Sequence, residues 1–311
     1  MMLRRTILPF LMLLACVPAR LHAQTIDDGV MLVKHDLFAG DVYTHDSWDH
    51  YWEGTLERTN GNIGTLTTQN NVWSANYGVT DRLNVIGLFP YVWTRASQGV
   101  LRGQSGFQDV TLAAKYRLFE HAASQYGSLR GIGVIAGGLP LTDYTPDFLP
   151  LSIGSASKRL SGRFTLNWQT HAGWFVNGSA AYTWRSHVTL DRPYYFTENT
   201  LFNTSEVDMP SVVESTASAG YLKNGLMADF VFSNQRTRGG GDIRRQDMPF
   251  VSNRMNFSKI GGQVMYPIPK LRSLVFELSY AYTVDGRNVG RATTITSGFL
   301  YHYQARRQPR S

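Results

Sequence analysis

Apolar and polar side chains alternate strictly along residues 106–119, which read GFQDVTLAAKYRLF. In steps of two, one set is apolar from Val110 to Leu118, whereas the other set carries Asp109, Lys115 and Arg117. A period of two predicts a β-strand whose two faces meet different environments. A strand of a soluble sandwich alternates in the same way, so the meaning of this stretch depends on its repetition along the chain.

The same alternation recurs along most of the chain after residue 60. It is clean over residues 159–170, 174–185 and 273–284, where aromatic residues gather near the ends of the apolar faces. The three predicted strands before residue 100 are less well patterned, and we include them because the order of short and long connections requires them. We therefore predict about twelve strands, over residues 31–43, 64–79, 84–95, 107–119, 129–140, 159–170, 173–187, 210–222, 225–238, 253–266, 272–284 and 291–303.

The connections between these predicted strands alternate in length. Tight turns fall around residues 80–83, 223–225 and 269–271. The long connections are polar and cover residues 44–62, 96–105, 141–158, 188–208 and 239–251. Outer-membrane barrels have this plan, with short periplasmic turns and long external loops, and an even number of strands places both termini at the periplasmic end.

The pattern predicts an all-β fold, a transmembrane antiparallel β-barrel of about twelve strands. Hydrocarbon offers no partner for a free backbone N–H or C=O group, so a sheet that crosses a membrane must close on itself. The soluble alternative is a large two-sheet sandwich, whereas a lipocalin-like barrel is disfavoured because it closes with eight strands. The long polar loops and the aromatic-rich outer faces favour the membrane barrel.

The N-terminus has the parts of a secretory signal peptide. Arg4 and Arg5 precede an apolar run over residues 7–17, and the small residue Ala23 precedes a cleavage site before Gln24. The run is too short for a membrane-spanning helix, which needs roughly 20 apolar residues. No later segment offers a run of that kind, so we predict no transmembrane helix.

These features divide the chain into a cleaved signal peptide (1–23), an outer-membrane β-barrel (24–303) and a short basic tail (304–311). The only cysteine, Cys16, lies within the signal. Its surroundings resemble a lipoprotein cleavage site, so lipidation is an alternative to its interpretation as part of the apolar run. A mature chain without cysteine has no disulfide and no thiolate metal site.

Composition agrees with a barrel that has a wet interior. Charged residues make up 17% of the chain, below the roughly 25% usual in soluble domains. The chain contains 29 Gly, 16 Phe, 16 Tyr and 7 Trp, yet its mean hydropathy is only −0.22, as expected when one strand face is polar. Signal-peptide arginines supply three of the net charge of +7. The rest forms no basic helix or aromatic-interleaved basic cluster, so we predict no nucleic-acid partner.

Three stretches carry a family resemblance. They are SWDHYWEGTLERTNGNIGTLTT, YGVTDRLNVIGLFPYVWT with the tight turn at 77–83 and Pro90-Tyr91, and the Gly-x-x-Asp-Val-x-Leu-x-x-Lys-Tyr pattern at 106–116. They resemble the outer-membrane family named after the meta-pathway of phenol degradation (MetA-type transporters), over residues 45–120 and by layout beyond. The resemblance implies an outer-membrane barrel that passes small hydrophobic or aromatic compounds. These motifs specify a fold and carry no chemistry.

Candidate chemistry is sparse. The outer-membrane phospholipase family is twelve-stranded and uses a His–Ser pair two residues apart on a lipid-facing strand. Only His45 and Ser47 have this spacing, in a predicted polar loop, and no Asn-Gly follows the serine. Together with Asp46 and Asp49, His45 and His50 could bind a metal, but a polar external loop explains them as well. We therefore predict no enzyme activity, no catalytic residue, no metal site and no cofactor.

The polar strand faces identify the residues predicted to line the lumen. If the strand phases are correct, six are basic and four acidic: Asp109, Lys115, Arg117, Arg159, Arg163, Arg185, Glu214, Asp229, Lys259 and Glu277, with Asn167 and Gln263 beside them. Either these charges fill a small barrel as a satisfied network, or the excess of cations favours anions and polarised solutes. Twelve strands are intermediate between filled eight-stranded and open sixteen-stranded barrels. The sequence thus predicts a narrow or gated passage.

We predict an outer-membrane channel for passive passage of small, hydrophobic or aromatic solutes. Its expected partners are outer-membrane lipids and a small-molecule solute, and its expected location is the cell outer membrane of a Gram-negative type envelope. The alternatives are a non-conducting structural or surface-binding barrel and an outer-membrane lipid hydrolase. No plug domain and no energy-coupling segment is evident in the sequence, so active transport is not indicated.

Overall fold

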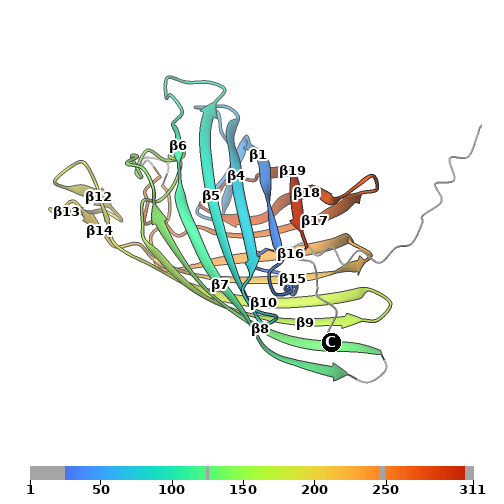
Figure 1. Cartoon of the computed structure of the whole chain (residues 1–311). Helices are drawn as coiled ribbons and strands as arrows, with labels where there is room; N and C mark the ends of the chain where they lie inside the picture. The colour runs from blue at the N-terminus through green and yellow to red at the C-terminus, as the bar shows by residue number, and fades with distance from the viewer. Residues whose placement is uncertain (1–24, 124–125, 245–248, 305–311) are drawn as a thin grey trace, which may run out of the picture.

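Twelve long strands form one closed antiparallel barrel in this computed structural model (Figure 1). The structure describes residues 25–123, 126–244 and 249–304. The predicted signal peptide with Cys16, and all but the first residue of the predicted basic tail, lie outside the described residues. Within the described ranges, no helix is long and apolar enough to span a membrane.

The barrel strands agree closely with the prediction from the sequence. They are β1 (Leu37–Trp48), β4 (Leu66–Gly78), β5 (Leu83–Ala96), β7 (Asp109–Ala123), β8 (Gly127–Pro140), β9 (Arg159–Thr170), β10 (Trp174–Arg185), β15 (Ser211–Lys223), β16 (Leu226–Arg238), β17 (Asn256–Ile268), β18 (Leu271–Arg287) and β19 (Thr293–Tyr303). The predicted fold class is confirmed.

The sheet closes between the first and last strands. β1 pairs with β19 from Leu37 opposite Tyr303 to Ser47 opposite Thr293, and its other edge pairs with β4. The remaining neighbours follow chain order around the wall, from β19 through β15, β10 and β7 to β5, which pairs again with β4. No barrel strand among the described residues is left with a free edge, as a sheet in hydrocarbon requires.

The two faces of each strand meet different environments. On β7, Leu112, Tyr116 and Leu118 point outward and are exposed, whereas Asp109 and Lys115 point inward and are buried. Elsewhere on the outer wall the exposed side chains are also large and apolar, for example Trp174 and Phe299. Such an apolar belt with aromatic residues towards its borders is typical of outer-membrane barrels.

A β-bulge interrupts this alternation near the periplasmic end of β7. The register with β8 shifts between Arg117 and Phe119, and both Leu118 and Phe119 are exposed. An extra residue in one strand turns the following side chains to the other face. The strict period of two predicted for 106–119 therefore ends at Leu118.

The prediction for the first strand is wrong at both ends. Residues 31–36, predicted as strand, precede β1, and His35 has a left-handed backbone with a φ of 68°. Residues 44–48, predicted as external loop, extend β1 because residues 44–47 pair on both sides with β4 and β19 and Trp48 pairs with β4. Part of the remaining loop is a hairpin of β2 (His50–Glu53) and β3 (Leu56–Thr59).

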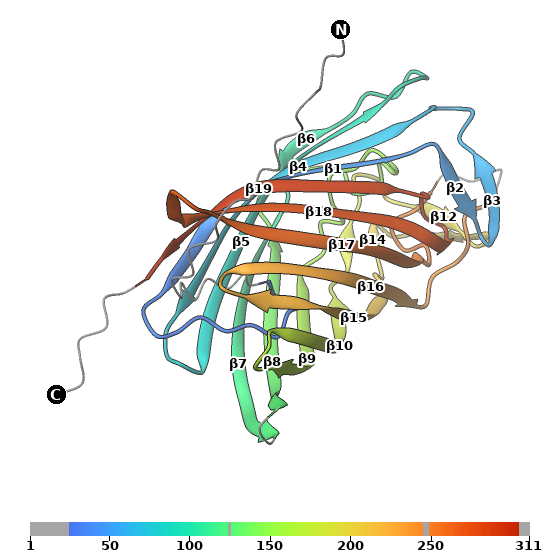
Figure 2. The same ribbon diagram turned by 90° about the vertical axis from the view of Figure 1, so that its right-hand side faces the viewer.

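The two ends of the barrel differ in the way the predicted connections indicate. Short turns join β4 to β5, β9 to β10 and β15 to β16, at the end where Leu37 and Tyr303 meet. The opposite end carries the small strands β6 (Ser105–Phe107), β11 (Val188–Thr189), β12 (Tyr195–Thr197), β13 (Thr200–Phe202) and β14 (Glu206–Val207) (Figure 2). By the plan of outer-membrane barrels, the first end is periplasmic and the second external.

The external loops have a hydrophobic core of their own. The ring of Tyr195 stacks on Phe202 and Phe250, with ring centres 5.0 and 5.1 Å apart. Around it pack buried residues from two loops, namely Val188, Leu190, Val207, Met209 and Val251. Because these loops bury apolar surface against each other, they form an ordered cap beside the external opening.

Candidate functional site

The N-terminal segment, residues 25–36, lies inside the barrel. Asp28 contacts Lys115 of β7, Asp27 contacts Arg163 of β9, and Leu32 belongs to a buried cluster with residues of β1, β10 and β15–β19. These strands stand on different sides of a closed wall (Figure 2, blue segment). A short segment can reach all of them only from within the lumen.

A buried ion pair fixes the tip of this segment. Lys115 Nζ donates to Asp28 Oδ1 at 2.7 Å and to the carbonyl oxygen of Thr25 at 2.8 Å, and Lys115 is fully buried. The Asp28 carboxylate also accepts the N–H of Val30 at 2.8 Å and hydrogen bonds from Thr25. Because both charges are removed from water, loss of one partner would leave the other uncompensated, which costs about 3–5 kcal/mol.

The middle of the segment is held by apolar packing. Leu32 is 2% exposed and lies in one cluster with Phe38, Phe175, Leu222, Met227, Met265, Val275 and Leu300, with Val30 and Val42 packed against it. These strand residues face the lumen near its periplasmic end. This apolar cluster therefore fills the periplasmic part of the lumen, where a water-filled barrel would carry polar side chains.

The segment leaves the lumen over the turn between β4 and β5. Gly78 accepts the N–H of His35 at 2.6 Å and donates its own N–H to the carbonyl of Asp36 at 2.9 Å. A Cβ atom on Gly78 would lie only 2.1 Å from the carbonyl oxygen of Val33, so this close approach requires glycine. Lys34 is fixed nearby, because its N–H donates to Asp81 Oδ1 at 3.1 Å.

Several residues predicted to line the lumen form ion pairs on the external side of the segment. Arg163 contacts Glu214 at 2.8 Å and Asp27 at 3.4 Å. Lys259 contacts Asp46 at 3.8 Å. The structure therefore places cations and carboxylates of nearby, non-adjacent strands, and of the segment, within reach of one another.

A further group lies at the external end of the lumen. Asp109 accepts a hydrogen bond from the hydroxyl of Tyr144 at 2.6 Å and lies 3.5 Å from Arg159. Burial, together with the hydrogen bond to the Asp109 carboxylate, raises the pKa of the Tyr144 phenol, which stays protonated and donates. Tyr144 thereby ties the loop after β8 to the barrel wall.

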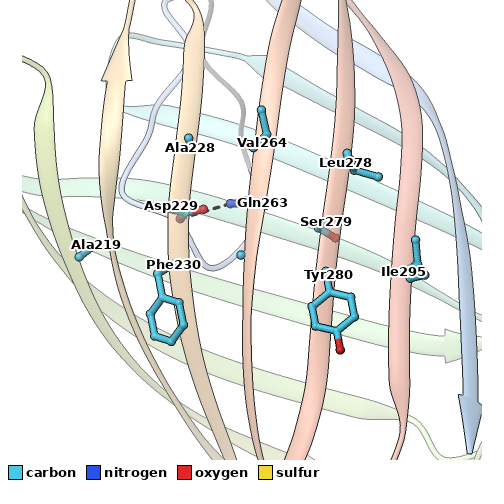
Figure 3. A pocket seen from close by; sticks show the side chains of 11 residues that line it. Ala219, Ala228, Asp229, Phe230, Gln263, Val264, Leu278, Ser279, Tyr280 and Ile295 are labelled. Carbon is cyan, nitrogen blue, oxygen red and sulfur yellow. Dashed lines mark hydrogen bonds between the residues drawn. The ribbon is translucent and has the colours of Figure 1, made fainter.

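The other predicted lining residues lie apart from these pairs. Arg117 contacts Glu120 at 2.5 Å at the periplasmic mouth. Asp229 accepts a hydrogen bond from Gln263 at 3.4 Å, while Phe230 and Tyr280 of the same wall belong to an apolar outer groove (Figure 3). Glu277 borders a cavity inside the lumen, and Arg185 makes no ion pair with another described residue.

An apolar chamber of about 310 Å³ lies inside the barrel beside the segment. Its apolar lining comes from five strands and from the segment: Ile26, Phe38, Val42, Val72, Ile86, Leu88, Met265 and Leu300. The polar groups at its border are few and include Asp27, Asn76 and Glu277. An apolar cavity with a few polar groups is the usual form of a small-molecule site.

A second cavity opens among the external loops. It measures about 490 Å³ and is lined mainly by Trp48, Tyr51, Ile63, Leu66, Leu101, Leu149, Pro150, Ile243, Met255 and Val289. A smaller cavity of about 180 Å³, bordered by Asp46 and Lys259, shares Trp48, Val289 and Gly290 with it. The two cavities therefore adjoin, and together they lead from the external loops towards the interior of the barrel.

A polar lock holds one side of this external cavity. Arg287 donates to both carboxylate oxygens of Asp242, at 2.7 and 2.6 Å, and Asn288 adds a third hydrogen bond at 2.9 Å. These hydrogen bonds lower the pKa of Asp242 to about 2. Asn288 also accepts the N–H groups of Gly54 and Ile243, so three external connections meet at one side chain.

The predicted metal candidates are separated. His50 contacts Asp49 at 2.8 Å, whereas Asp46 points into the lumen and accepts a hydrogen bond from Thr294 at 2.6 Å. In the part of the chain that is described, no three His, Cys, Asp or Glu side chains are grouped to hold a metal ion. His45 and Ser47 lie on β1, not in a loop as predicted, and no hydrogen bond joins them.

Comparison with known families gives a match over residues 57–297 to the family described as "Putative MetA-pathway of phenol degradation". The chain belongs to this family. The crystal structure of an outer membrane channel from Pseudomonas putida F1 matches with a TM-score of 0.71 at 13% identity, covering 90% of this chain and 100% of that one. Among curated proteins, none matches the chain in sequence.

More distant matches among solved structures are also outer-membrane barrels. The NanC porin has a TM-score of 0.46 at 9% identity, covering 85% of this chain and 99% of its own. The CymD monoaromatic hydrocarbon channel has a TM-score of 0.43 at 10% identity, covering 88% of this chain and 90% of its own. Membership of the phenol-degradation family, together with the barrel fold, places the protein in the outer membrane, as predicted.

The strand pattern of the sequence did not reveal the segment that occupies the lumen of this family member. Two signals were present: Asp27 and Asp28 are the fourth and fifth residues after the predicted signal peptide, and the predicted lumen had six cations for four carboxylates. The two aspartates bring the missing negative charges, because they contact Arg163 and Lys115. The excess of cations in the predicted lumen is therefore balanced from within the chain.

Proposed function

We propose that the protein is a passive outer-membrane channel for small hydrophobic solutes, including aromatic ones, and that residues 25–36 close its periplasmic end. The observation that carries this proposal is the apolar chamber next to the segment. At about 310 Å³ it is about twice the roughly 150 Å³ of an apolar cavity that binds benzene. One or two small apolar molecules would therefore fit.

The lining supports hydrophobic solutes over ions. Phe38, Ile86 and Leu300 offer no hydrogen bonds to a hydrated ion, so an ion would lose hydration without compensation. A hydrocarbon would instead gain from leaving water, by about 25 cal/mol for each Å² buried. The external cavity, also mainly apolar, would collect such solutes before they reach the chamber.

The segment gives the passage a movable closure. It belongs to no strand, and only side-chain contacts and a few backbone hydrogen bonds hold residues 25–34 in the lumen. A shift of this segment would join the chamber to the periplasm without breaking the barrel sheet. Catalysis has no part in this proposal.

Solute uptake tests the proposal. Purified barrel is reconstituted into vesicles whose outer leaflet is lipopolysaccharide, which slows the unassisted entry of hydrocarbons, and entry of radiolabelled toluene and of glucose is measured. We expect faster entry of toluene than in protein-free vesicles, with little change for glucose. Equal toluene entry with and without the protein would indicate instead a non-conducting structural or surface-binding barrel.

A variant that fills the chamber sharpens this test. Ile86 is 2% exposed and lines the chamber, so Ile86→Trp should reduce toluene uptake. Ile135 points outward and is 67% exposed, so Ile135→Trp adds the same bulk on the lipid face and should leave uptake unchanged. Heat-modifiable migration in gels checks that both variants are folded. Equal uptake by both variants would place the path outside this chamber.

A further inference from the structure

The outer face of β16 changes in chemistry from the membrane interior to the external end. In steps of two it carries Ala228, Phe230, Phe232, Asn234, Arg236 and Arg238. Both arginines are exposed and lie on the same face as Phe232, whereas Thr237 between them is buried. At about 3.3 Å per residue, they lie about 13 and 20 Å beyond Phe232 along the strand.

Neighbouring strands mark the border of the hydrocarbon at this point. Asn234 donates a hydrogen bond to the hydroxyl of Ser258 at 2.8 Å, and it lies opposite Ser215 of β15. Asn234, Ser258 and Ser215 thus form a polar row across three strands, two residues beyond the apolar row that contains Phe232. Tyr182 lies in the same row as Arg236, two strands away through Val213, and its ring is half-exposed. Tyrosine on the outer wall is typical of the membrane–water interface.

The two guanidinium groups are without a partner among the residues that the structure describes. No ion pair or hydrogen bond joins the side chain of Arg236 or Arg238 to another residue of the described ranges. Arg287, by comparison, is paired, since its guanidinium group donates two hydrogen bonds to the carboxylate of Asp242. Asp285 is exposed and lies opposite Ser258, but β17 separates its strand from β16.

We propose that Arg236 and Arg238 form a binding site for a phosphate group of an outer-leaflet lipid. Guanidinium groups bind phosphate oxygens through paired, charge-assisted hydrogen bonds. A lipid whose acyl chains lie along Phe230 and Phe232 would carry its phosphate to the height of these arginines. The aromatic ring of Tyr182 would flank its headgroup. The site lies on the outer wall, apart from the lumen, and does not depend on what the channel passes.

Charge and position together select a lipid over a soluble anion. A free phosphate ion would meet two exposed cations in water, where screening weakens the attraction. A lipid gains in addition from the apolar row below, which holds its chains next to the site. The site therefore requires both the phosphate and the acyl chains of the same molecule.

Native mass spectrometry of the purified barrel in detergent tests this assignment. The probe is a diphosphorylated lipid A, compared with the same lipid after removal of its phosphates and with inorganic phosphate. We expect lipid A to bind, and both comparison ligands to bind at least about tenfold more weakly, because each lacks one half of the recognised molecule. Equal binding of the dephosphorylated lipid would overturn the proposal, and so would tight binding of inorganic phosphate alone.

Matched variants localise the site. The double variant Arg236→Gln/Arg238→Gln should weaken lipid A binding about tenfold, because it removes both charge-assisted contacts. The control Arg82→Gln/Lys223→Gln removes the same charge from exposed periplasmic turns and should bind as the parent does. Heat-modifiable migration confirms that each variant is folded. A similar loss in both variants, or in neither, would contradict a site on β16.

Discussion

The two ends of the lumen are built differently. At the periplasmic end, residues 25–36 fill the barrel with an apolar cluster and a buried ion pair. At the external end, cavities of about 490 and 180 Å³ remain between loops that pack on one another. The external half therefore contains open cavities between ordered loops. The barrier to solute passage lies instead in residues 25–36, which belong to no strand.

This contrast explains how one chain can be stable and still open. The barrel wall is stabilised by continuous strand pairing around its circumference. The closure is instead held by side chains, chiefly Asp28 and Leu32, whose contacts can be lost locally while the sheet stays intact. Low-stability elements of this kind are where functional motions occur.

The largest effect of a single substitution is expected at the buried ion pair. Lys115→Met leaves the Asp28 carboxylate buried without its cation, which weakens docking of the segment by about 3–5 kcal/mol. We expect larger conductance in planar bilayers and faster proteolysis within residues 25–36. Arg117→Met, two residues further along the same strand, removes a half-exposed pair with Glu120 and should change little. If both variants behave alike, the ion pair does not hold the closure.

A smaller effect is expected from the apolar cluster. Leu32→Ala removes a side chain that is 2% exposed and should weaken docking by about 2–5 kcal/mol. More frequent open events in single-channel recordings would show this loss. Leu112→Ala on the outer face, where Leu112 is 58% exposed, serves as the control. Unchanged gating in Leu32→Ala would mean that the segment is not held by its apolar side.

Ion selectivity should respond moderately to a charge above the segment. Arg163→Glu places a third carboxylate beside Asp27 and Glu214, so we expect the cation preference to rise about threefold, as pore-lining charges set selectivity. Reversal potentials in a salt gradient give this ratio. Arg82→Glu in a periplasmic turn is the control. An unchanged ratio would show that ions do not pass near Arg163.

The smallest effect is expected at the external lock. The pKa of Asp242 is lowered to about 2, below the ordinary value of roughly 3.9. Its contribution to loop stability is therefore present above about pH 4 and is lost as the pH falls towards 2. The protection of the backbone amides of residues 239–244, measured relative to intrinsic exchange at each pH, should be similar at pH 5 and pH 8 and lower in Asp242→Asn. Low protection in the parent already at pH 5 would contradict a role of Asp242 in holding these loops.

Much of the wall was predictable from the sequence, whereas the closure was not. The alternation over 159–170 gave the bounds of β9, and the order of connections supplied strands that had poor patterns of their own. Residues 30–33 are apolar and follow each other without a turn signal, so strand was the natural prediction for them. Their true role depends on the packing of Leu32 against Met227 and on the ion pair of the preceding Asp28 with Lys115, which no local pattern encodes.

The lumen charges show the same limit. Strand phase assigned Asp109 and Lys115 to the face of β7 opposite the apolar outer row, and both side chains are buried. The strand phase does not predict which charges pair, because Arg163 contacts Glu214 and Asp27 only when the barrel is closed and residues 25–36 lie in its lumen. The sequence signals for a missing acidic element were the unequal count of cations and carboxylates and the pair Asp27-Asp28 after the predicted signal peptide.

Planar-bilayer recording of the barrel with residues 25–34 deleted tests the central claim most directly. Deletion removes the closure and the carboxylates of Asp27 and Asp28, while β1 from Leu37 onward remains intact. We predict a conductance about tenfold higher than that of the parent, together with a shift towards anions, because pore-lining charges set selectivity and the deletion removes the carboxylates that face Lys115 and Arg163. A folded deletion variant with the conductance and selectivity of the parent would contradict the claim that this segment closes the lumen.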